Sequence, residues 1–90
     1  MLIEWDDRKN EDNFKKHGIW FEEAQTVIFN PLTLIATNSN PKGDRMEYLG
    51  HSNQSKFLYV VTAEKSDDTI SIISARKATS KERAQYEKGI

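Results

Sequence analysis

The stretch KFLYVVTAEKSDDTISIISAR, residues 56–76, decides the fold of this 90-residue chain. It contains two runs rich in β-branched and aromatic residues, 56–64 and 69–76, which are typical of strands. The four residues between them, KSDD, are turn formers. Strands joined by so short a connection favour antiparallel pairing, so the stretch predicts two antiparallel strands.

Further strands are predicted on the N-terminal side of this pair. RMEYLGH, residues 45–51, alternates between two faces, and LTLIAT, residues 32–37, is short and β-branched. NSNPKGD, residues 38–44, lies between them and is dense in turn formers. LIEW, residues 2–5, reads as one more short strand. The sequence therefore predicts a sheet of about four to five strands.

A first helix is predicted between Asp7 and Lys16. Asp6 or Asp7 can cap its start, and Gly18 can adopt the left-handed conformation that ends it. Phe14 is its only large apolar residue. We therefore expect Phe14 to be its single buried anchor and most of its surface to meet water or a partner.

Two more helices complete the predicted fold. Residues 21–29 hold apolar residues at near-helical spacing, and Pro31 ends this helix because the residue before a proline disfavours the α region. Thr79 and Glu82 have capping-box spacing for a last helix through about Lys88. The order predicts an α+β fold: an antiparallel sheet with two N-terminal helices and one C-terminal helix.

Size and composition limit the possible functions. A chain of this length can form one core and not two, so we expect a single domain over residues 1–90. The sequence has no cysteine, and no apolar run approaches the roughly 20 residues of a membrane span, so we expect a soluble, cytoplasmic protein without membrane contact. His17 and His51 lack further ligands at helical spacing, and no glycine-rich phosphate loop occurs. No metal site and no cofactor is therefore expected.

The net charge of −1 hides an uneven distribution. Residues 1–30 carry seven acidic and four basic side chains, whereas residues 76–88 carry five basic and two acidic ones. The overall charge is not that of a typical nucleic-acid-binding protein, which is usually basic. The C-terminal end can nevertheless present a local basic patch.

Arg76 and Lys77 stand at the end of the last predicted strand and leave it on opposite faces, because side chains alternate along a strand. A guanidinium group at a rigid strand end suits phosphate, since its fork matches two phosphate oxygens. Arg83 and Tyr86, three residues apart on the following helix, can be neighbours. The residues leave open the alternative that these cations make ordinary surface contacts with acidic residues of the same helix.

Two long motifs resemble the signatures of the BrnT toxin family. EWDDRKNEDNFKKHGIWFEEA, residues 4–24, is similar to the N-terminal signature, and IISARKATSKERAQYE, residues 72–87, is similar to the C-terminal one. Between them, Arg45 followed by Leu49 and Gly50 is similar to a strand motif of the family. The resemblance spans nearly the whole chain and implies a compact, RelE-like ribonuclease fold.

The resemblance also implies a function. It is that of the toxin of a type II toxin–antitoxin module, a metal-independent endoribonuclease that cleaves RNA and inhibits translation. The implied partners are RNA and a BrnA-like ribbon-helix-helix antitoxin, which neutralises the toxin and links it to operator DNA. A heterotetramer follows if two toxins bridge a dimeric antitoxin. The alternative is a non-catalytic protein-binding module that acts only as a co-repressor with its partner.

Metal-independent cleavage requires a base for the ribose 2′-OH, stabilisation of charge on the phosphate and a proton for the 5′-oxygen. We expect Arg76 and Arg45 to hold phosphate, and His17 or Glu82 to transfer protons. The other candidates are Lys16 and Lys77 as electrostatic support and, as RNA contacts, Arg83, Tyr86 and Lys81. The proposal requires Arg45 and Arg76 to reach one surface. DNA lacks the 2′-OH and should not be cut.

Overall fold

The structure is a computed structural model that describes residues 1–38 and 45–89. Its elements are β1 (Leu2–Glu4), α1 (Asp7–His17), α2 (Phe21–Phe29), β2 (Leu34–Asn38), β3 (Arg45–His51), β4 (Phe57–Ser66), β5 (Thr69–Lys77) and α3 (Ser80–Glu87). Each predicted helix and strand is present, with bounds that differ by one or two residues at most. The turn predicted at 38–44 lies, beyond Asn38, outside the described residues. None of the helices in the described ranges is both long enough and apolar enough to span a membrane.

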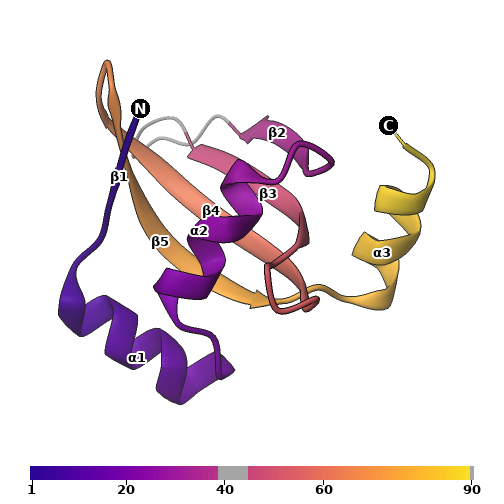
Figure 1. Cartoon of the computed structure of the whole chain (residues 1–90), viewed down its shortest axis with the longest axis horizontal. Coiled ribbons are helices and arrows are strands. Elements are labelled where there is room, and N and C mark those ends of the chain that lie inside the picture. The colour runs from indigo at the N-terminus through magenta and orange to yellow at the C-terminus, as the bar shows by residue number, and fades with distance from the viewer. Residues whose placement is uncertain (39–44, 90) are drawn as a thin grey trace.

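The five strands form one sheet in the order β1-β5-β4-β3-β2 (Figure 1). The predicted antiparallel pairing is confirmed for β2 to β5, which form a meander. The short strand β1 pairs parallel to β5, with Leu2 opposite Thr69, so the sheet is mixed. A parallel neighbour requires a long connection, and the chain between β1 and β5 provides one.

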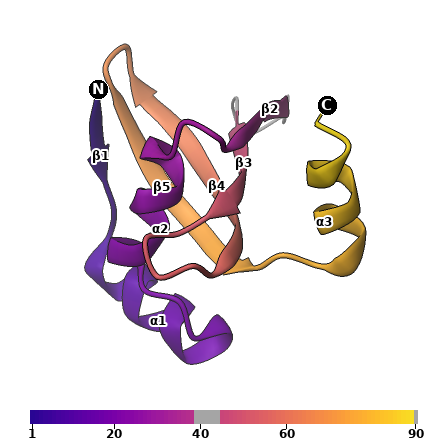
Figure 2. The same ribbon diagram turned by 45° about the vertical axis from the view of Figure 1, so that its right-hand side comes forward.

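The hydrophobic core lies between α2 and one face of the sheet, which α2 crosses (Figure 1 and Figure 2). Phe21, Ala24 and Val27 are fully buried and share one face of the helix. They meet the strand residues of this cluster, which are Tyr48, Leu58, Val60, Ile72 and Ala75. The strand residues between these positions point to the opposite face of the sheet.

A buried asparagine, Asn13, attaches α1 to the sheet. Its Nδ2 donates to the carbonyl oxygens of Ile19 (2.9 Å) and Ala75 (2.8 Å), and its Oδ1 accepts the Ala75 N–H (3.1 Å). The Asn13 amide thus makes with β5 the hydrogen bonds that a neighbouring strand would make. It does so at Ala75, where β5 is an edge strand because β1 pairs only with residues 69–71. The prediction that Phe14 is the buried anchor is wrong. Phe14 is 39% exposed and stacks on Trp20 with ring centroids 4.1 Å apart.

A second buried asparagine, Asn10, joins α1 to the start of α2. Trp20 occupies the N-cap of α2 and makes no side-chain cap hydrogen bond. Instead, Asn10 Oδ1 accepts the Phe21 N–H at 2.7 Å, and Asn10 Nδ2 donates to Glu22 at 2.8 Å. Asn10 therefore satisfies from α1 the N–H group of the first residue of α2, one of the N–H groups that have no partner within the helix.

α3 follows β5 and packs at one end of the sheet face opposite α2 (Figure 2). The Tyr86 hydroxyl donates to the Leu32 carbonyl at 3.1 Å, and its ring packs edge-on against Phe57 with centroids 5.0 Å apart. No residue of α3 is fully buried. Further along the same face, Tyr59 and Val61 stay half-buried, so this part of the sheet remains open to a ligand.

Candidate active site

Arg76, the arginine that was predicted to bind phosphate, lies near the end of β5 and is bound by Glu82 in the first turn of α3. The capping box is confirmed, because the Thr79 N–H donates to Glu82 Oε1 at 2.8 Å and the Glu82 N–H donates to Thr79 Oγ1 at 3.2 Å. The same carboxylate accepts two hydrogen bonds from Arg76, at 2.9 Å from Nη1 and 2.8 Å from Nη2. Glu82 thus joins the end of β5 to the start of α3.

This pairing sets the charge of both groups. The hydrogen bond from Arg76 is the main cause that lowers the pKa of Glu82, and the same bond raises the pKa of Arg76. Glu82 is therefore ionised at neutral pH, where it can accept a proton but has none to donate. The Arg76 side chain is 35% exposed, so part of it stays accessible to a ligand.

Tyr59 joins this cluster from β4. It lies opposite Arg76 in the β4–β5 register, and the guanidinium carbon is 4.3 Å from the centroid of its ring. Burial, and then a hydrogen bond with Glu47, raises the pKa of Tyr59 to about 12, so the phenol is protonated at neutral pH. Tyr59 and Glu47 are site residues that no motif in the sequence indicated. The available signal was that Tyr59 and Arg76 lie on strands predicted to pair.

A cavity of about 150 Å³ lies between the sheet and α3. Its apolar lining comes from Leu34, Ala36 and Leu49, and its polar lining from Glu47, Tyr59, Glu82 and Gln85. The cavity is smaller than the roughly 300 Å³ at which small-molecule pockets usually begin. It therefore suits one part of a larger ligand better than a complete small molecule.

Arg45 shares the sheet face of Arg76 but not its immediate surroundings. Arg45 lies opposite Ala63, which is four residues along β4 from Tyr59, so both arginines point to the same face. Four residues along the strands and two strands across separate their Cα atoms by roughly 16 Å. The two arginines can therefore face one nucleic-acid strand, but at different phosphates.

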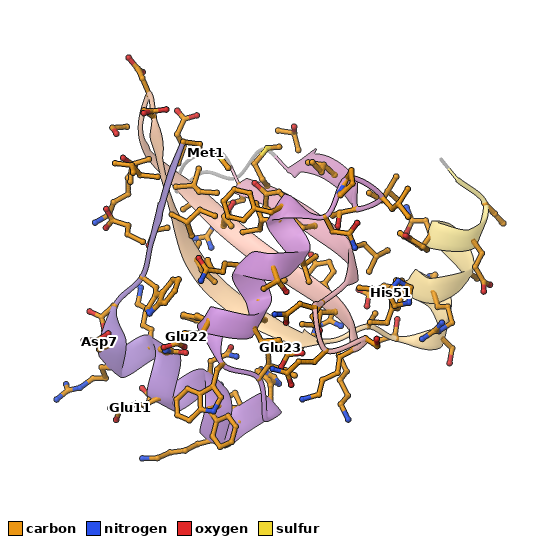
Figure 3. The ribbon with its side chains drawn as sticks, viewed as in Figure 1. Met1, Asp7, Glu11, Glu22, Glu23 and His51 are labelled. Atoms are coloured by element: carbon orange, nitrogen blue, oxygen red, sulfur yellow. The ribbon has the colours of Figure 1, made fainter. Side chains whose placement is uncertain are left out.

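Two of the predicted RNA contacts, Arg83 and Tyr86, pack against the sheet. The Arg83 guanidinium carbon lies 4.6 Å from the centroid of the Phe57 ring. Tyr86 meets Phe57 and also His51, whose ring centroid is 5.9 Å away, and Figure 3 shows His51 beside α3. These contacts position α3, and Arg83 keeps an exposed side chain.

The remaining lysines of the C-terminal segment lie outside the cavity. Lys77 is exposed and lies opposite Leu58, which belongs to the core face, so it leaves β5 on the face opposite to that of Arg76, as predicted. Its carbonyl oxygen accepts a hydrogen bond from Arg76 Nη1 at 3.2 Å. Lys81 is exposed on α3. Both lysines can contribute positive charge at this end of the molecule.

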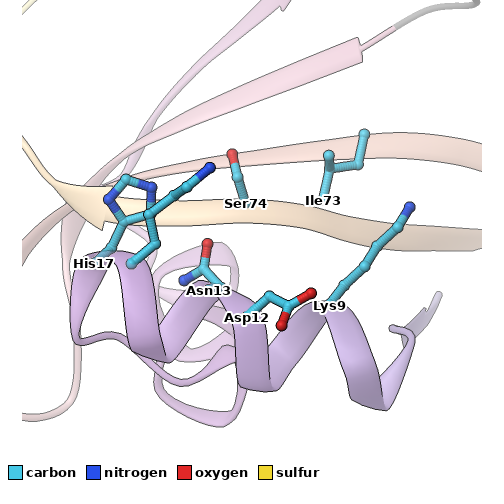
Figure 4. A pocket seen from close by; sticks show the side chains of 7 residues that line it. Lys9, Asp12, Asn13, His17, Ile73 and Ser74 are labelled. Atoms are coloured by element: carbon cyan, nitrogen blue, oxygen red, sulfur yellow. The ribbon is translucent and has the colours of Figure 1, made fainter.

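The other two candidates, Lys16 and His17, line a second hollow, which we call the α1–β5 cleft (Figure 4). The cleft has a volume of about 280 Å³, and its lining residues are Lys9, Asp12, Asn13, Lys16, His17, Ile73 and Ser74. His17 and Glu82, the two candidates for proton transfer, therefore line different hollows. Within residues 1–38 and 45–89, no three His, Asp or Glu side chains lie close enough together to hold a metal ion.

Comparison with known proteins gives a family match and a structural match. Residues 5–82 match the family model described as "Ribonuclease toxin, BrnT, of type II toxin-antitoxin system". The fold is similar to the 1.1 Å crystal structure of the Brucella abortus ribonuclease toxin BrnT. That match has a TM-score of 0.69 and 23% sequence identity, and it covers 88% of this chain and 97% of the Brucella chain. No curated protein matches the sequence.

Proposed function

The chain belongs to the BrnT family of ribonuclease toxins of type II toxin–antitoxin systems, and from this premise we propose that it is an endoribonuclease whose reaction centres on Arg76 and Glu82. The observation that carries the proposal is their bidentate pairing beside Tyr59, on a face of the sheet that a ligand can reach. The guanidinium group of Arg76 carries a positive charge, and its two parallel N–H groups fit two oxygens of a phosphate group. Glu82 is an ionised carboxylate within the same hydrogen-bonded unit and can act as a base.

The proposed reaction uses the ribose 2′-OH as the nucleophile and requires no metal ion. When the RNA phosphate takes over hydrogen bonds of Arg76, Glu82 is released to accept the 2′-OH proton. The 2′-oxygen then bonds to the adjacent phosphorus while the bond from phosphorus to the 5′-oxygen breaks. Arg76 stabilises the charge on the phosphate oxygens. The leaving 5′-oxygen takes a proton from water, because His17, the other residue predicted to transfer protons, lines the α1–β5 cleft and not the cavity beside Glu82.

The other predicted residues surround this centre. We propose that Arg45 holds a phosphate further along the RNA, because it lies on the same face at roughly 16 Å. Lys16 and Lys77 supply positive charge, and the proposed contacts from α3 are Arg83, Tyr86 and Lys81. Since the Tyr86 hydroxyl is bound to Leu32, we expect the main contribution of Tyr86 to be holding α3 in place.

The proposed cellular role follows from the family. A type II module includes an antitoxin, and we propose that this one is a BrnA-like ribbon-helix-helix protein that neutralises the toxin in the cytoplasm. Free toxin would then cleave RNA and inhibit translation. Two toxins on a dimeric antitoxin would form a heterotetramer, which reaches operator DNA only through the antitoxin.

The test is cleavage of RNA by the purified protein in the presence of a chelator. We expect the wild-type protein to cut RNA but not DNA of the same sequence, because DNA lacks the 2′-OH. Arg76→Ala should reduce kcat by about 100-fold or more, as the loss of a charge-stabilising donor does in other enzymes. Lys15→Ala is the matched control, because Lys15 is an exposed cation outside both hollows.

Three results would contradict parts of the proposal. Full activity of Arg76→Ala would show that Arg76 does not take part in the reaction. Loss of activity in the presence of the chelator would show that the reaction requires a metal ion. If the wild-type protein is folded and binds its antitoxin but cuts no RNA, the chain is the non-catalytic co-repressor module. Circular dichroism of each variant shows whether the fold is retained.

A further inference from the structure

We propose that the α1–β5 cleft binds the phosphate backbone of the RNA next to the segment held at Arg76, and that Lys9 is one of its RNA-binding residues. This inference rests on the proposed ribonuclease function and extends its substrate site to a second subsite. A single-stranded RNA would then pass along β5 from the cavity beside Tyr59 to the edge covered by α1.

The helical spacing of α1 places the cationic groups on the side that faces β5. Lys9, Asn13 and Lys16 follow one another at intervals of four and three residues, which is one face of a helix. Figure 4 shows Lys9 and His17 on this face, on either side of Asn13 and across from Ser74. Over the seven residues from Lys9 to Lys16 the helix rises by about 10 Å, so the two ammonium groups can bind different phosphates.

The hydrogen bonds of Asn13 hold the cleft in a fixed position relative to the proposed catalytic centre. Asn13 is 7% exposed and binds both the N–H and the carbonyl oxygen of Ala75, the residue next to Arg76 in β5. Ser74 lines the cleft and is two residues before Arg76, a Cα separation of roughly 7 Å along a strand. Ser74 and Arg76 pair with Val61 and Tyr59 of β4, so both lie on the same face of β5, and the cleft therefore borders the face that carries Arg76.

The charge of the cleft favours an anionic ligand. Lys9 and Lys16 are exposed, and neither forms an ion pair within the described part of the chain. Among the described lining residues, Asp12 is the one carboxylate, so Lys9 and Lys16 leave a net positive charge. Ile73 is the one large apolar residue among the described lining residues. A protein interface usually buries several large side chains as anchors, so this lining does not resemble one. The phosphates of RNA fit this lining better.

The test measures binding of a 2′-O-methyl RNA of about twelve nucleotides, which the proposed reaction cannot cleave because its 2′-oxygen is blocked. We expect Lys9→Ala to weaken binding several-fold at low salt, measured by fluorescence anisotropy. The slope of log K against log salt should also fall by about 0.7, the contribution of one phosphate contact on a single strand. Lys9→Glu should weaken binding further. With cleavable RNA, the change caused by Lys9→Ala should be in KM rather than in kcat.

Lys15→Ala and Lys15→Glu are the matched controls. Lys15 is exposed on the same helix but lies outside the cleft. If only the total positive charge matters, substitutions at Lys15 and at Lys9 weaken RNA binding equally. If the cleft is a subsite, only the substitutions at Lys9 weaken it. Equal effects at Lys9 and Lys15 would overturn the proposal, and so would a Lys9→Ala variant that weakens antitoxin binding but not RNA binding. The proposed ribonuclease function is tested separately. If the wild-type protein binds the blocked RNA through Lys9 but cleaves no RNA, the proposed subsite is supported and the proposed ribonuclease activity is wrong.

Discussion

The guanidinium group of Arg76 and the carboxylate of Glu82 form two hydrogen bonds, of 2.9 and 2.8 Å, that join the end of β5 to the first turn of α3. In the free protein, the group best suited to bind phosphate is therefore already bound to a carboxylate. An RNA phosphate must replace part of this pairing, so RNA binding and the anchoring of α3 compete for the same arginine.

Replacement of Arg76 by lysine tests the geometry of this group separately from its charge. Lysine keeps the positive charge but cannot make two parallel hydrogen bonds to one phosphate. We expect Arg76→Lys to lower kcat/KM for RNA cleavage by about 10- to 100-fold, the equivalent of one charged hydrogen bond. Arg8→Lys, an exposed position on α1, should have no effect. An Arg76→Lys enzyme as active as the wild type would show that charge alone is sufficient.

The Arg76–Glu82 pair should make stability depend on pH in the acidic range. The pKa of Glu82 is lowered in the folded protein from its ordinary value of 4.5. The pair therefore stabilises the fold fully above that ordinary value, and the contribution is lost as the pH falls through the lowered, folded-state pKa. In urea denaturation at neutral pH, we expect Glu82→Gln to be less stable than the wild type by about 1 kcal/mol.

This difference between Glu82→Gln and the wild type should shrink as the pH is lowered below about 4.5. Glu87→Gln is the control, because Glu87 is an exposed carboxylate near the end of the same helix. A difference that stays constant over the whole pH range would show that the ionised Glu82–Arg76 pair is not its cause.

Loss of the Asn13 amide should destabilise the protein. Asn13→Ala leaves the N–H and carbonyl of Ala75 and the carbonyl of Ile19 without this partner. Each unsatisfied buried group costs about 1–3 kcal/mol, and water can reach a strand edge, so we expect a total loss of about 2–4 kcal/mol in urea denaturation. Asn53→Ala, at an exposed position, should change stability by less than about 0.5 kcal/mol. Equal stability of the two variants would show that Asn13 does not hold α1 on the sheet.

A side chain at position 50 should clash with Thr33. A Cβ atom added to Gly50 would lie 2.5 Å from Thr33 Oγ1 and 3.1 Å from Thr33 Cβ. We expect Gly50→Ala to lower the free energy of unfolding by about 1–3 kcal/mol. Thr33→Ala removes the nearest of these atoms, so the double variant should be more stable than the sum of the two single changes predicts. Strict additivity in this double-mutant cycle would show that the contact with Thr33 is not the cause.

The sequence predicted the elements of this fold because their signals are local. Alternation along 56–64 and 69–76, the turn between them and the capping box at Thr79 each depend on residues a few positions apart. The opposite directions of Arg76 and Lys77 follow from the period of a strand alone. These features did not require knowledge of the rest of the chain.

The anchoring of α1 and the pairing of β1 required the tertiary structure. The sequence predicts an apolar anchor for α1, and Phe14 is the one large apolar residue that it offers between Asp7 and Lys16. The structure uses Asn13 instead, whose partner Ala75 is 62 residues away in sequence. The parallel pairing of β1 with β5 is equally distant. Contacts of this range leave no periodic signal in a single sequence.

The sequence by itself determined which cationic and acidic side chains the candidate site could use. Only the tertiary structure decided that Arg76 pairs with Glu82 above Tyr59, that Arg45 lies roughly 16 Å further along the same face, and that His17 lines a separate cleft. The physical reason is that side-chain direction follows from local backbone geometry, whereas the distance between two side chains depends on strand register and helix packing, which the whole core sets.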